Sequence, residues 1–200
     1  MNKNLLKVEN LTMKFGGLTA IDDLSFSANN NEITSIIGPN GAGKSTFLHA
    51  VLGLLKTEGS LEVLGLDPFK DRHELLKRVC SITDVAVLPK WMTVDQVLDY
   101  VEGVHPEFDP KKARHILSKT NIRKKSKVRT LSRGMIVQLH LSIVMAIDAE
   151  LLVLDEPTLG LDLVYRKEFY SQLIEDYFDG NKTILISTHQ VEEIEGVLTD

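Results

Sequence analysis

The chain has 200 residues and a net charge of −5, from 28 acidic and 23 basic residues. That length suits one domain with a sizeable core, and the negative balance argues against a nucleic-acid binder as a whole. The single cysteine, Cys80, excludes an internal disulfide and fits a buried structural thiol in a reducing compartment. No stretch reaches the roughly 18 apolar residues of a membrane span, so we expect a soluble chain that acts on a membrane only through a partner.

Strand-like runs open the chain. Leu5–Glu9 and Thr19–Phe26 mix apolar and polar positions, as strands with one exposed face do. An asparagine-rich turn at residues 29–31 separates them from the apolar run Ile33–Ile37. We expect a third strand in that run, and the spacing of Phe47–Leu52 predicts a helix shortly after it.

A glycine-rich segment joins this strand to this helix. It reads Gly38-Pro39-Asn40-Gly41-Ala42-Gly43-Lys44-Ser45-Thr46. The segment matches G-x-x-x-x-G-K-[ST], and a strand before it and a helix after it are the context of a phosphate-binding P-loop. The N–H groups of the loop and of the helix N-terminus would face the phosphates. Lys44 is expected to reach the β- and γ-phosphates, and the Ser45 hydroxyl to bind Mg²⁺.

The middle of the chain changes character after a strand expected around Ser60–Leu64. Helical spacing marks four stretches, Arg72–Val79, Thr93–Val101, Lys111–Thr120 and Gly134–Ile147. We therefore predict a helical lobe at about residues 70–148, inserted between two halves of an α/β core. Ten Lys and Arg residues fall between Lys111 and Arg133, and we interpret them as a solvated face rather than a nucleic-acid or anionic-lipid surface.

The core resumes with the apolar runs Leu151–Leu154 and Thr183–Ser187, which are typical of central parallel strands. Asp155 and Glu156 follow the first run, and a strand that ends in Asp-Glu resembles a Walker B motif, the usual companion of a P-loop. Asp155 would hold Mg²⁺ near the phosphates. Glu156 would orient or deprotonate the attacking water.

A third motif, Leu131-Ser132-Arg133-Gly134-Met135, precedes a long helical segment. With it, the chain resembles the nucleotide-binding domain of an ABC transporter, whose signature is usually Leu-Ser-Gly-Gly-Gln. Arg133 and Met135 depart from that pattern, and the Leu-Ser-x-Gly-Met form is similar to that of bacterial exporter subunits. The resemblance implies that Ser132 and Gly134 contact the γ-phosphate bound by the opposite subunit. Taken alone, Ser132 is also a plain N-cap candidate.

The same resemblance assigns four further residues. Asp162 matches the D-loop residue that communicates across a dimer, and His189 matches the switch histidine that reaches the γ-phosphate. Phe15 matches the aromatic that stacks on adenine, with a half-buried strand residue as the alternative. Asp84 falls where the family has a glutamine that senses Mg²⁺ and the membrane partner; aspartate keeps an oxygen ligand but is shorter and charged.

Taken together, the resemblance implies one ABC ATPase domain over residues 1–200. Its fold would be a three-layer α/β P-loop core with an antiparallel β subdomain near the N-terminus and the inserted helical subdomain. Two such subunits, identical or different, would bind ATP and Mg²⁺ and hydrolyse ATP to drive transport, specifically export, through an integral membrane permease. The resemblance implies that the protein is cytoplasmic and acts at the inner face of the cell membrane. We expect no nucleic-acid partner.

Two alternatives to this function stay open. One is a non-transport ABC ATPase acting on ribosomes or DNA, and the other is a regulatory ATP-binding module with little turnover. The family continues beyond the helical segment at residues 191–195 with further strands. We therefore expect Asp200 to be a truncated end.

Overall fold

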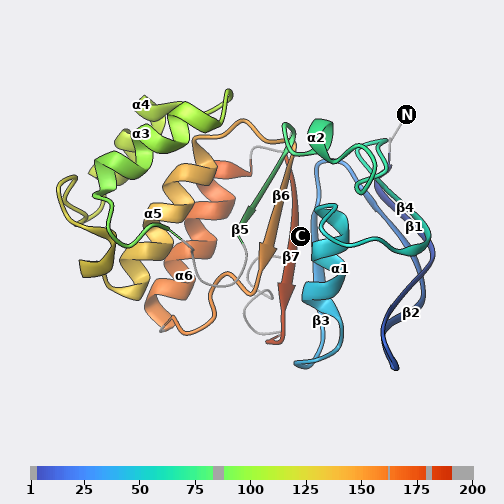
Figure 1. Ribbon diagram of the computed structural model, residues 1–200. Helices are drawn as coiled ribbons and strands as arrows, with labels where there is room; N and C mark the ends of the chain where they lie inside the picture. Colours follow the sequence, from blue (N-terminus) through green and yellow to red (C-terminus); the bar gives the residue numbers. More distant parts are fainter. Residues whose placement is uncertain (1–3, 83–87, 162, 179–181, 191–200) are drawn as a thin grey trace.

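Two β-sheets and several helices make up the computed structural model, which describes all residues except 1–3, 83–87, 162, 179–181 and 191–200 (Figure 1). One sheet is antiparallel with the strand order β2-β1-β4, and the other is parallel with the order β3-β7-β6-β5. The predicted α/β class, with an antiparallel sheet near the N-terminus, is confirmed. Within the described ranges, no helix is both long enough and apolar enough to cross a membrane.

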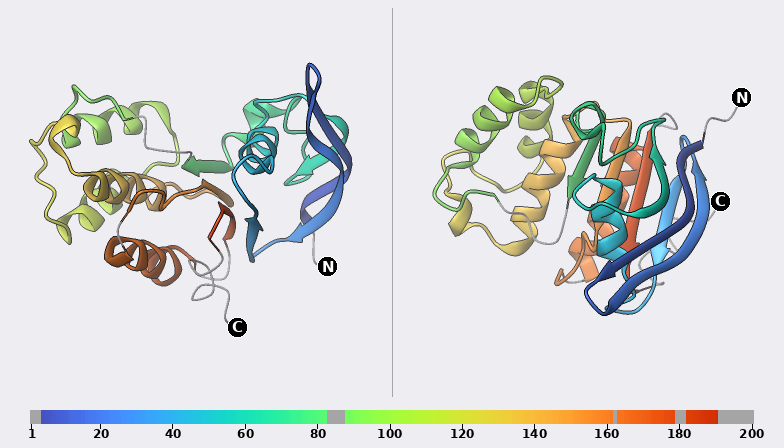
Figure 2. Two further views of the ribbon diagram at one scale, coloured as in Figure 1. Left: turned by 90° about the horizontal axis from the view of Figure 1, so that it is seen from below. Right: turned by 45° about the vertical axis from the view of Figure 1, so that its right-hand side comes forward.

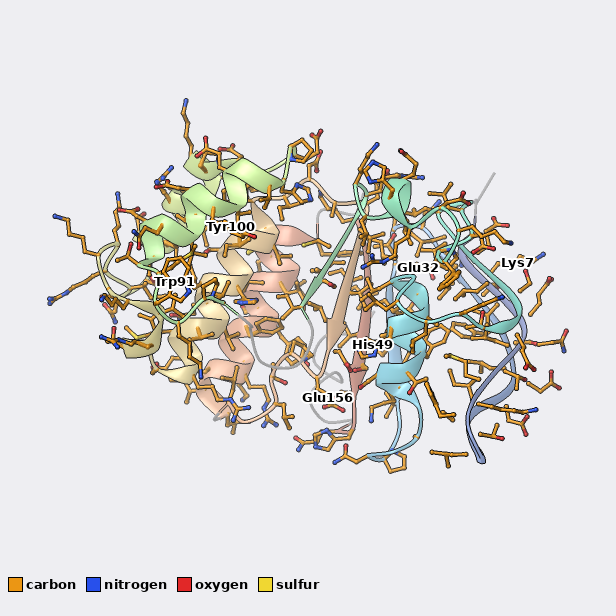
Figure 3. All side chains as sticks on the ribbon, in the orientation of Figure 1. Lys7, Glu32, His49, Trp91, Tyr100 and Glu156 are labelled. Carbon is orange, nitrogen blue, oxygen red and sulfur yellow. The ribbon has the colours of Figure 1, made fainter. Side chains whose placement is uncertain are left out.

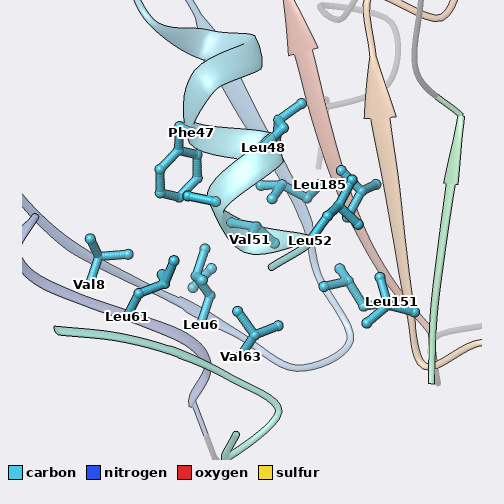
Figure 4. Packing of buried hydrophobic residues seen from close by; sticks show 14 of the residues in the cluster. Leu6, Val8, Phe47, Leu48, Val51, Leu52, Leu61, Val63, Leu151 and Leu185 are labelled. Atoms are coloured by element: carbon cyan, nitrogen blue, oxygen red, sulfur yellow. The ribbon is translucent and has the colours of Figure 1, made fainter. Parts of the chain in front are cut away.

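The antiparallel sheet consists of β1 (Asn4–Phe15), β2 (Leu18–Asn29) and β4 (Glu58–Val63). All three were expected, but β1 and β2 are longer than their sequence pattern predicts because they form one continuous hairpin. Along β1, Leu6 and Val8 are buried whereas Lys7 and Glu9 are exposed, which is the alternation of a strand with one covered face. That face packs against α1 (Lys44–Val51), as Figure 4 shows.

The parallel sheet consists of β3 (Ile33–Ile37), β5 (Val79–Ile82), β6 (Leu151–Asp155) and β7 (Thr183–Thr188). Every residue of β6 and β7 is buried, which explains the apolar runs Leu151–Leu154 and Ile184–Ile186 within them. The helix predicted over Arg72–Val79 is correct only for α2 (Arg72–Leu75). Val79 instead begins β5, because pairing with β6 in the sheet overrides the local helical spacing.

The remaining helical elements are α3 (Val94–Val104), α4 (Pro110–Ser118), the 3-10 turn Val128–Thr130, α5 (Arg133–Met145), α6 (Leu163–Gln172) and the π-helical turn Leu173–Tyr177. Of these, helices α3, α4 and α5 occur where the sequence predicts them, with shifted ends. Helix α3 begins with a capping box in which the Thr93 and Gln96 side chains each accept a hydrogen bond from the other residue's backbone N–H. Helix α6 was not predicted from the sequence.

The helices α3, α4 and α5 lie at one end of the molecule and the antiparallel sheet at the other, with the parallel sheet between them (Figures 1 and 2). Three apolar clusters correspond to this arrangement. The first joins α1 to both sheets, the second joins β5, β6 and β7 to α5 and α6, and the third lies among α3, α4 and α5. The carboxyl ends of β3, β6 and β7 meet at one edge of the parallel sheet, where the predicted site residues converge.

Candidate nucleotide site

The predicted P-loop connects β3 directly to α1, as its sequence context requires. Gly43 has a φ of +88° and is the N-cap of α1. A Cβ atom at this position would lie 2.4 Å from the carbonyl oxygen of Ala20 in β2. Glycine is therefore needed at residue 43 both for its left-handed conformation and for the close approach of the loop to β2. The start of the loop is also anchored, because the N–H of Gly38 donates to the carbonyl of Thr188 at the end of β7 (3.3 Å).

Lys44 is buried at the start of α1, with 8% of its surface exposed. Its ammonium group donates to the carbonyl oxygens of Gly38 (2.8 Å) and Pro39 (3.2 Å), so the side chain folds back over the loop. The same nitrogen lies 3.3 Å from Oε1 of Glu156. The ammonium group of Lys44 therefore lies between the carbonyl oxygens of the loop and the Glu156 carboxylate, which follows β6.

Asp155 and Glu156 stand where β6 ends, next to β7 (Figure 3). The hydroxyl of Ser187 donates to Oδ1 of Asp155. The N–H of Glu156 in turn donates to Ser187, with its hydroxyl 3.1 Å and its carbonyl oxygen 3.2 Å away. Glu156 has a φ of +46°, which is uncommon for a residue with a side chain. Ser187 thus fixes both carboxylate residues at the edge of the sheet.

The two oxygens of the Glu156 carboxylate have different surroundings. Oε2 lies 2.6 Å from Nδ1 of His189, just beyond the end of β7. Oε1 faces the ammonium of Lys44, yet it is buried and has no hydrogen-bond donor among the described residues. The ion pair with Lys44 is its one polar contact among the described residues, and a buried carboxylate oxygen that loses such a partner needs another donor. Oε1 is therefore suited to accept a hydrogen bond from a water molecule or a ligand.

The donors for a Mg²⁺ ion predicted from the sequence are the Ser45 hydroxyl and the Asp155 carboxylate. Ser45 lies in the first turn of α1, directly after Lys44, and its side chain is exposed. Asp155 ends the neighbouring strand β6. One hydroxyl and one carboxylate, completed by phosphate and water oxygens, make up the donor set that Mg²⁺ favours. The residues present thus fit the ion.

The segment Ser132–Gly134 lies apart from the P-loop, at the start of α5 on the far side of the parallel sheet from α1 (Figures 1 and 2). The Ser132 hydroxyl accepts a hydrogen bond from the N–H of Met135 (3.3 Å), so it is an N-cap. Gly134 is buried, and a Cβ atom there would lie 3.4 Å from the ring of Tyr165 in α6. The guanidinium of Arg133 covers Gly160, where an added Cβ would come within 2.2 Å of it. This segment is therefore packed against the turn that follows Glu156.

A family model described as "ABC transporter" matches residues 21–159, which is more than half of the chain. The chain belongs to the ABC transporter family. The curated relatives described next are named as ATP-binding proteins. The bacitracin transport ATP-binding protein BcrA of Bacillus licheniformis is 33% identical over 195 residues, which cover 96% of this chain and 63% of that protein. The SkfA peptide export ATP-binding protein SkfE of Bacillus subtilis is 31% identical over 194 residues, covering 94% of this chain and 80% of that protein.

Solved ABC proteins share the fold. The structure of cbiO1 from Clostridium perfringens, described as part of the ABC transporter complex cbiONQ, is 26% identical and superposes with a TM-score of 0.81 over 96% of this chain and 80% of that one. The ADP conformation of the ATP-binding cassette MJ1267 gives a TM-score of 0.80 at 24% identity, covering 96% of this chain and 84% of that one. The present chain spans 64% and 63% of two of the curated relatives that it matches. It corresponds to the ATP-binding domain of the family.

Two of the residues assigned from the ABC pattern, Asp84 and Asp162, lie outside the described residues. Phe15 is the last residue of β1, with 48% of its surface exposed. The hairpin that carries Phe15 adjoins the P-loop, because Ala20 and the Ile21 side chain of its second strand face Gly43. An exposed aromatic near the loop is available for stacking on a base.

Two residues near His189 were not identified from the sequence. Arg166 in α6 donates to Oε1 of Gln190 (2.6 Å), and Nε2 of Gln190 lies 3.2 Å from Nε2 of His189. Gln190 directly follows the predicted histidine in the sequence. Arg166, however, is 24 residues away from Gln190, and no local pattern connects them.

Proposed function

We propose that this ABC domain hydrolyses ATP with Glu156 as the group that orients and deprotonates the attacking water. The observation that supports this role is the Glu156 carboxylate itself, since Oε2 is fixed by His189 and Oε1 has no hydrogen-bond donor among the described residues. A general base must lie within hydrogen-bond reach of the proton that it takes. Oε1 makes no hydrogen bond to a described residue and is paired with the Lys44 ammonium, so it would accept from a water molecule once that ammonium moves.

Binding of ATP would rearrange the contacts of Lys44. The ammonium now lies against Glu156 and two loop carbonyls, and phosphate oxygens offer it a stronger, charge-assisted partner. Transfer of Lys44 to the phosphates frees Oε1 of Glu156 for the water, while His189 keeps Oε2 in place. A Mg²⁺ ion held by Ser45 and Asp155 would neutralise charge that develops on the phosphates.

The proposal includes a second ATPase subunit. Ser132 and Gly134 lie on the opposite side of the sheet from the P-loop of their own chain, so they would reach a phosphate only across an interface. Each of two sites would then combine Lys44, Glu156 and His189 of one subunit with Ser132 and Gly134 of the other. Closure on ATP and reopening after hydrolysis would shift the population of two states and so move a membrane partner.

We further propose export as the direction of transport, with a permease as the partner and the inner face of the cell membrane as the place of action. The support comes from relatives named for bacitracin transport, Nod factor export and SkfA peptide export. The division into a core and a helical subdomain at about residues 70–148 belongs to the same proposal. It is supported by the separate apolar cluster among α3, α4 and α5.

The substitution Glu156→Gln tests the proposed reaction. Glutamine keeps the shape of glutamate and one acceptor oxygen for His189 but cannot take a proton, so ATP binding should persist while hydrolysis falls by about 100-fold or more. With ATP and Mg²⁺, the variant should form a dimer on size-exclusion chromatography that is absent with ADP. Glu150→Gln is the matched control, because Glu150 pairs with Arg78 at the other end of β6 and should not affect turnover.

The association experiment should include the ATPase subunit that co-purifies with the native transporter, since the natural dimer can be formed by two different chains. Two results together would refute the mechanism. They are hydrolysis by Glu156→Gln at the parent rate, and no ATP-dependent association with either partner. The regulatory module with little turnover would then replace it.

A further inference from the structure

Arg166 and Gln190 form a layer of polar side chains behind His189. One terminal nitrogen of Arg166 donates to Oε1 of Gln190 (2.6 Å), and the other donates to the carbonyl oxygen of Leu161 (3.3 Å). The backbone N–H of Gln190 donates to the Thr188 hydroxyl (3.1 Å). The Gln190 amide is therefore held at its oxygen by a guanidinium from α6 and at its backbone by the end of β7.

Arg166 decides which way the Gln190 amide points. A guanidinium has only donors, so the amide atom facing it must be the oxygen. The amide nitrogen then faces the imidazole, where it lies 3.2 Å from Nε2 of His189. An arrangement with the amide reversed would set the NH₂ group against the guanidinium, donor against donor.

The amide in turn decides which nitrogen of His189 carries the proton. An amide nitrogen only donates, so Nε2 of His189 must accept, and a neutral imidazole then carries its single proton on Nδ1. Nδ1 is the atom that lies 2.6 Å from Oε2 of Glu156. The proton position assigned from these partners makes His189 a hydrogen-bond donor to the Glu156 carboxylate.

We propose that Arg166 and Gln190 are positioning residues that hold His189 in the tautomer with the proton on Nδ1. The alternative tautomer would turn the lone pair of Nδ1 toward Oε2 of Glu156, in a pocket where the Glu156 side chain is 13% exposed. Two acceptors that face each other in such a pocket repel. Loss of Arg166 or Gln190 would therefore release the carboxylate that His189 orients. The tautomer stands on the described contacts alone, and only its effect on turnover rests on the proposed function.

Nitrogen NMR tests the tautomer without nucleotide. The full chain is labelled with ¹⁵N-histidine, and long-range proton–nitrogen correlations are recorded at about pH 8, where an ordinary histidine is neutral. The chain has six histidines, and the spectrum of a His189→Gln variant assigns the signals of His189. We expect Nδ1 to resonate as a protonated nitrogen and Nε2 as an unprotonated one.

Gln190→Glu is the decisive variant. A glutamate keeps an acceptor for Arg166 and the length of the side chain, but it presents an oxygen to Nε2 of His189 in place of the NH₂ group. Nε2 should therefore gain a proton, and because Oε2 of Glu156 still faces Nδ1, both nitrogens of His189 should be protonated. Gln96→Glu is the matched control, since it adds the same charge at a capping box that accepts glutamate equally well, and it should leave His189 unchanged.

Arg166→Leu provides a second route to the same test, because a free amide can take either orientation. The signals of His189 should then report both tautomers, while the other five histidines show that the fold is intact. A parent spectrum with Nε2 protonated would overturn the proposal, as would a Gln190→Glu spectrum in which Nε2 stays unprotonated.

Turnover separates this proposal from the function itself. Gln190→Glu should lower kcat for ATP by at least about tenfold and leave nucleotide affinity nearly unchanged, because a charged His189 makes the neighbouring Glu156 carboxylate a weaker base. Protonation of Nε2 at parent turnover would support the positioning role and contradict the proposed part of Glu156 and His189 in hydrolysis.

Discussion

Gly43 and Gly65 provide a matched pair for measuring how tightly the P-loop is packed. Both have left-handed backbones, with φ of +88° and +79°. A Cβ atom at Gly43 would lie 2.4 Å from the Ala20 carbonyl, whereas a Cβ atom at Gly65 meets nothing within 4 Å. Alanine at either position therefore imposes the same backbone strain, but only Gly43→Ala also imposes a clash.

The expected costs follow from these two terms. An alanine in the left-handed region costs about 1–2 kcal/mol, which is the whole expected effect of Gly65→Ala. The clash of Gly43→Ala requires the backbone of β2 or of the loop to shift, and overpacking of this kind adds about 1–3 kcal/mol. With a urea m value of about 3 kcal/mol/M, the midpoint of Gly43→Ala should lie about 0.3–1 M below that of Gly65→Ala.

The two variants should also differ in ligand binding. Calorimetric titration with ATP and Mg²⁺ should show weaker binding for Gly43→Ala, because the shifted loop presents its N–H groups less well, and parent-like binding for Gly65→Ala. Equal urea midpoints for the two variants would refute the packing argument. Parent-like ATP affinity in Gly43→Ala would show that the position of the loop against β2 does not matter for the nucleotide.

Three other substitutions or surfaces give simpler expectations. Lys44→Ala should abolish measurable ATP binding in calorimetry, since the ammonium is the buried charge of the loop; unchanged affinity would contradict the P-loop assignment. Burial lowers the pKa of His140 to about 4, so the unfolded chain takes up a proton first and stability should fall as pH drops from about 6.5 towards 4. His140→Leu should flatten that part of the urea midpoint profile, and an unchanged slope would exclude His140 as its source. The basic residues between Lys111 and Arg133 should show no binding to duplex DNA or RNA at physiological salt; binding with a steep salt dependence would favour the non-transport alternative.

The sequence predicts those parts of the site that are local along the chain. The strand, loop and helix around Lys44 are contiguous, so one motif determines all three. The burial of β6 and β7 is equally visible, because their centres are the apolar runs Leu151–Leu154 and Ile184–Ile186. The N-cap role of Ser132 also follows from short-range hydrogen bonding.

The parts that could not be predicted depend on tertiary contacts. Helix α6 buries Phe169 and Tyr170 but leaves Leu163, Val164 and Tyr165 exposed. Its own apolar residues are therefore spread around the helix, and no single apolar face in the sequence marks it as helical. Strand β5 pairs with β6, which lies about seventy residues later in the sequence. The contact between Arg166 and Gln190 likewise arises only when α6 packs beside the end of β7.

The backbone of Glu156 explains how one carboxylate reaches both Lys44 and His189. Regular continuation of β6 would alternate side chains across the two faces of the sheet, but the φ of +46° at Glu156 ends the strand abruptly. A left-handed residue with a side chain costs of the order of 1–3 kcal/mol, and two contacts hold it, the N–H bond to Ser187 and the bond from the Leu159 N–H to the Glu156 carbonyl (3.0 Å). The turn at Glu156 is therefore stabilised by β7 on one side and by the following loop on the other. Because His189 directly follows β7, the end of this strand both fixes the backbone of the carboxylate residue and positions the donor to its Oε2.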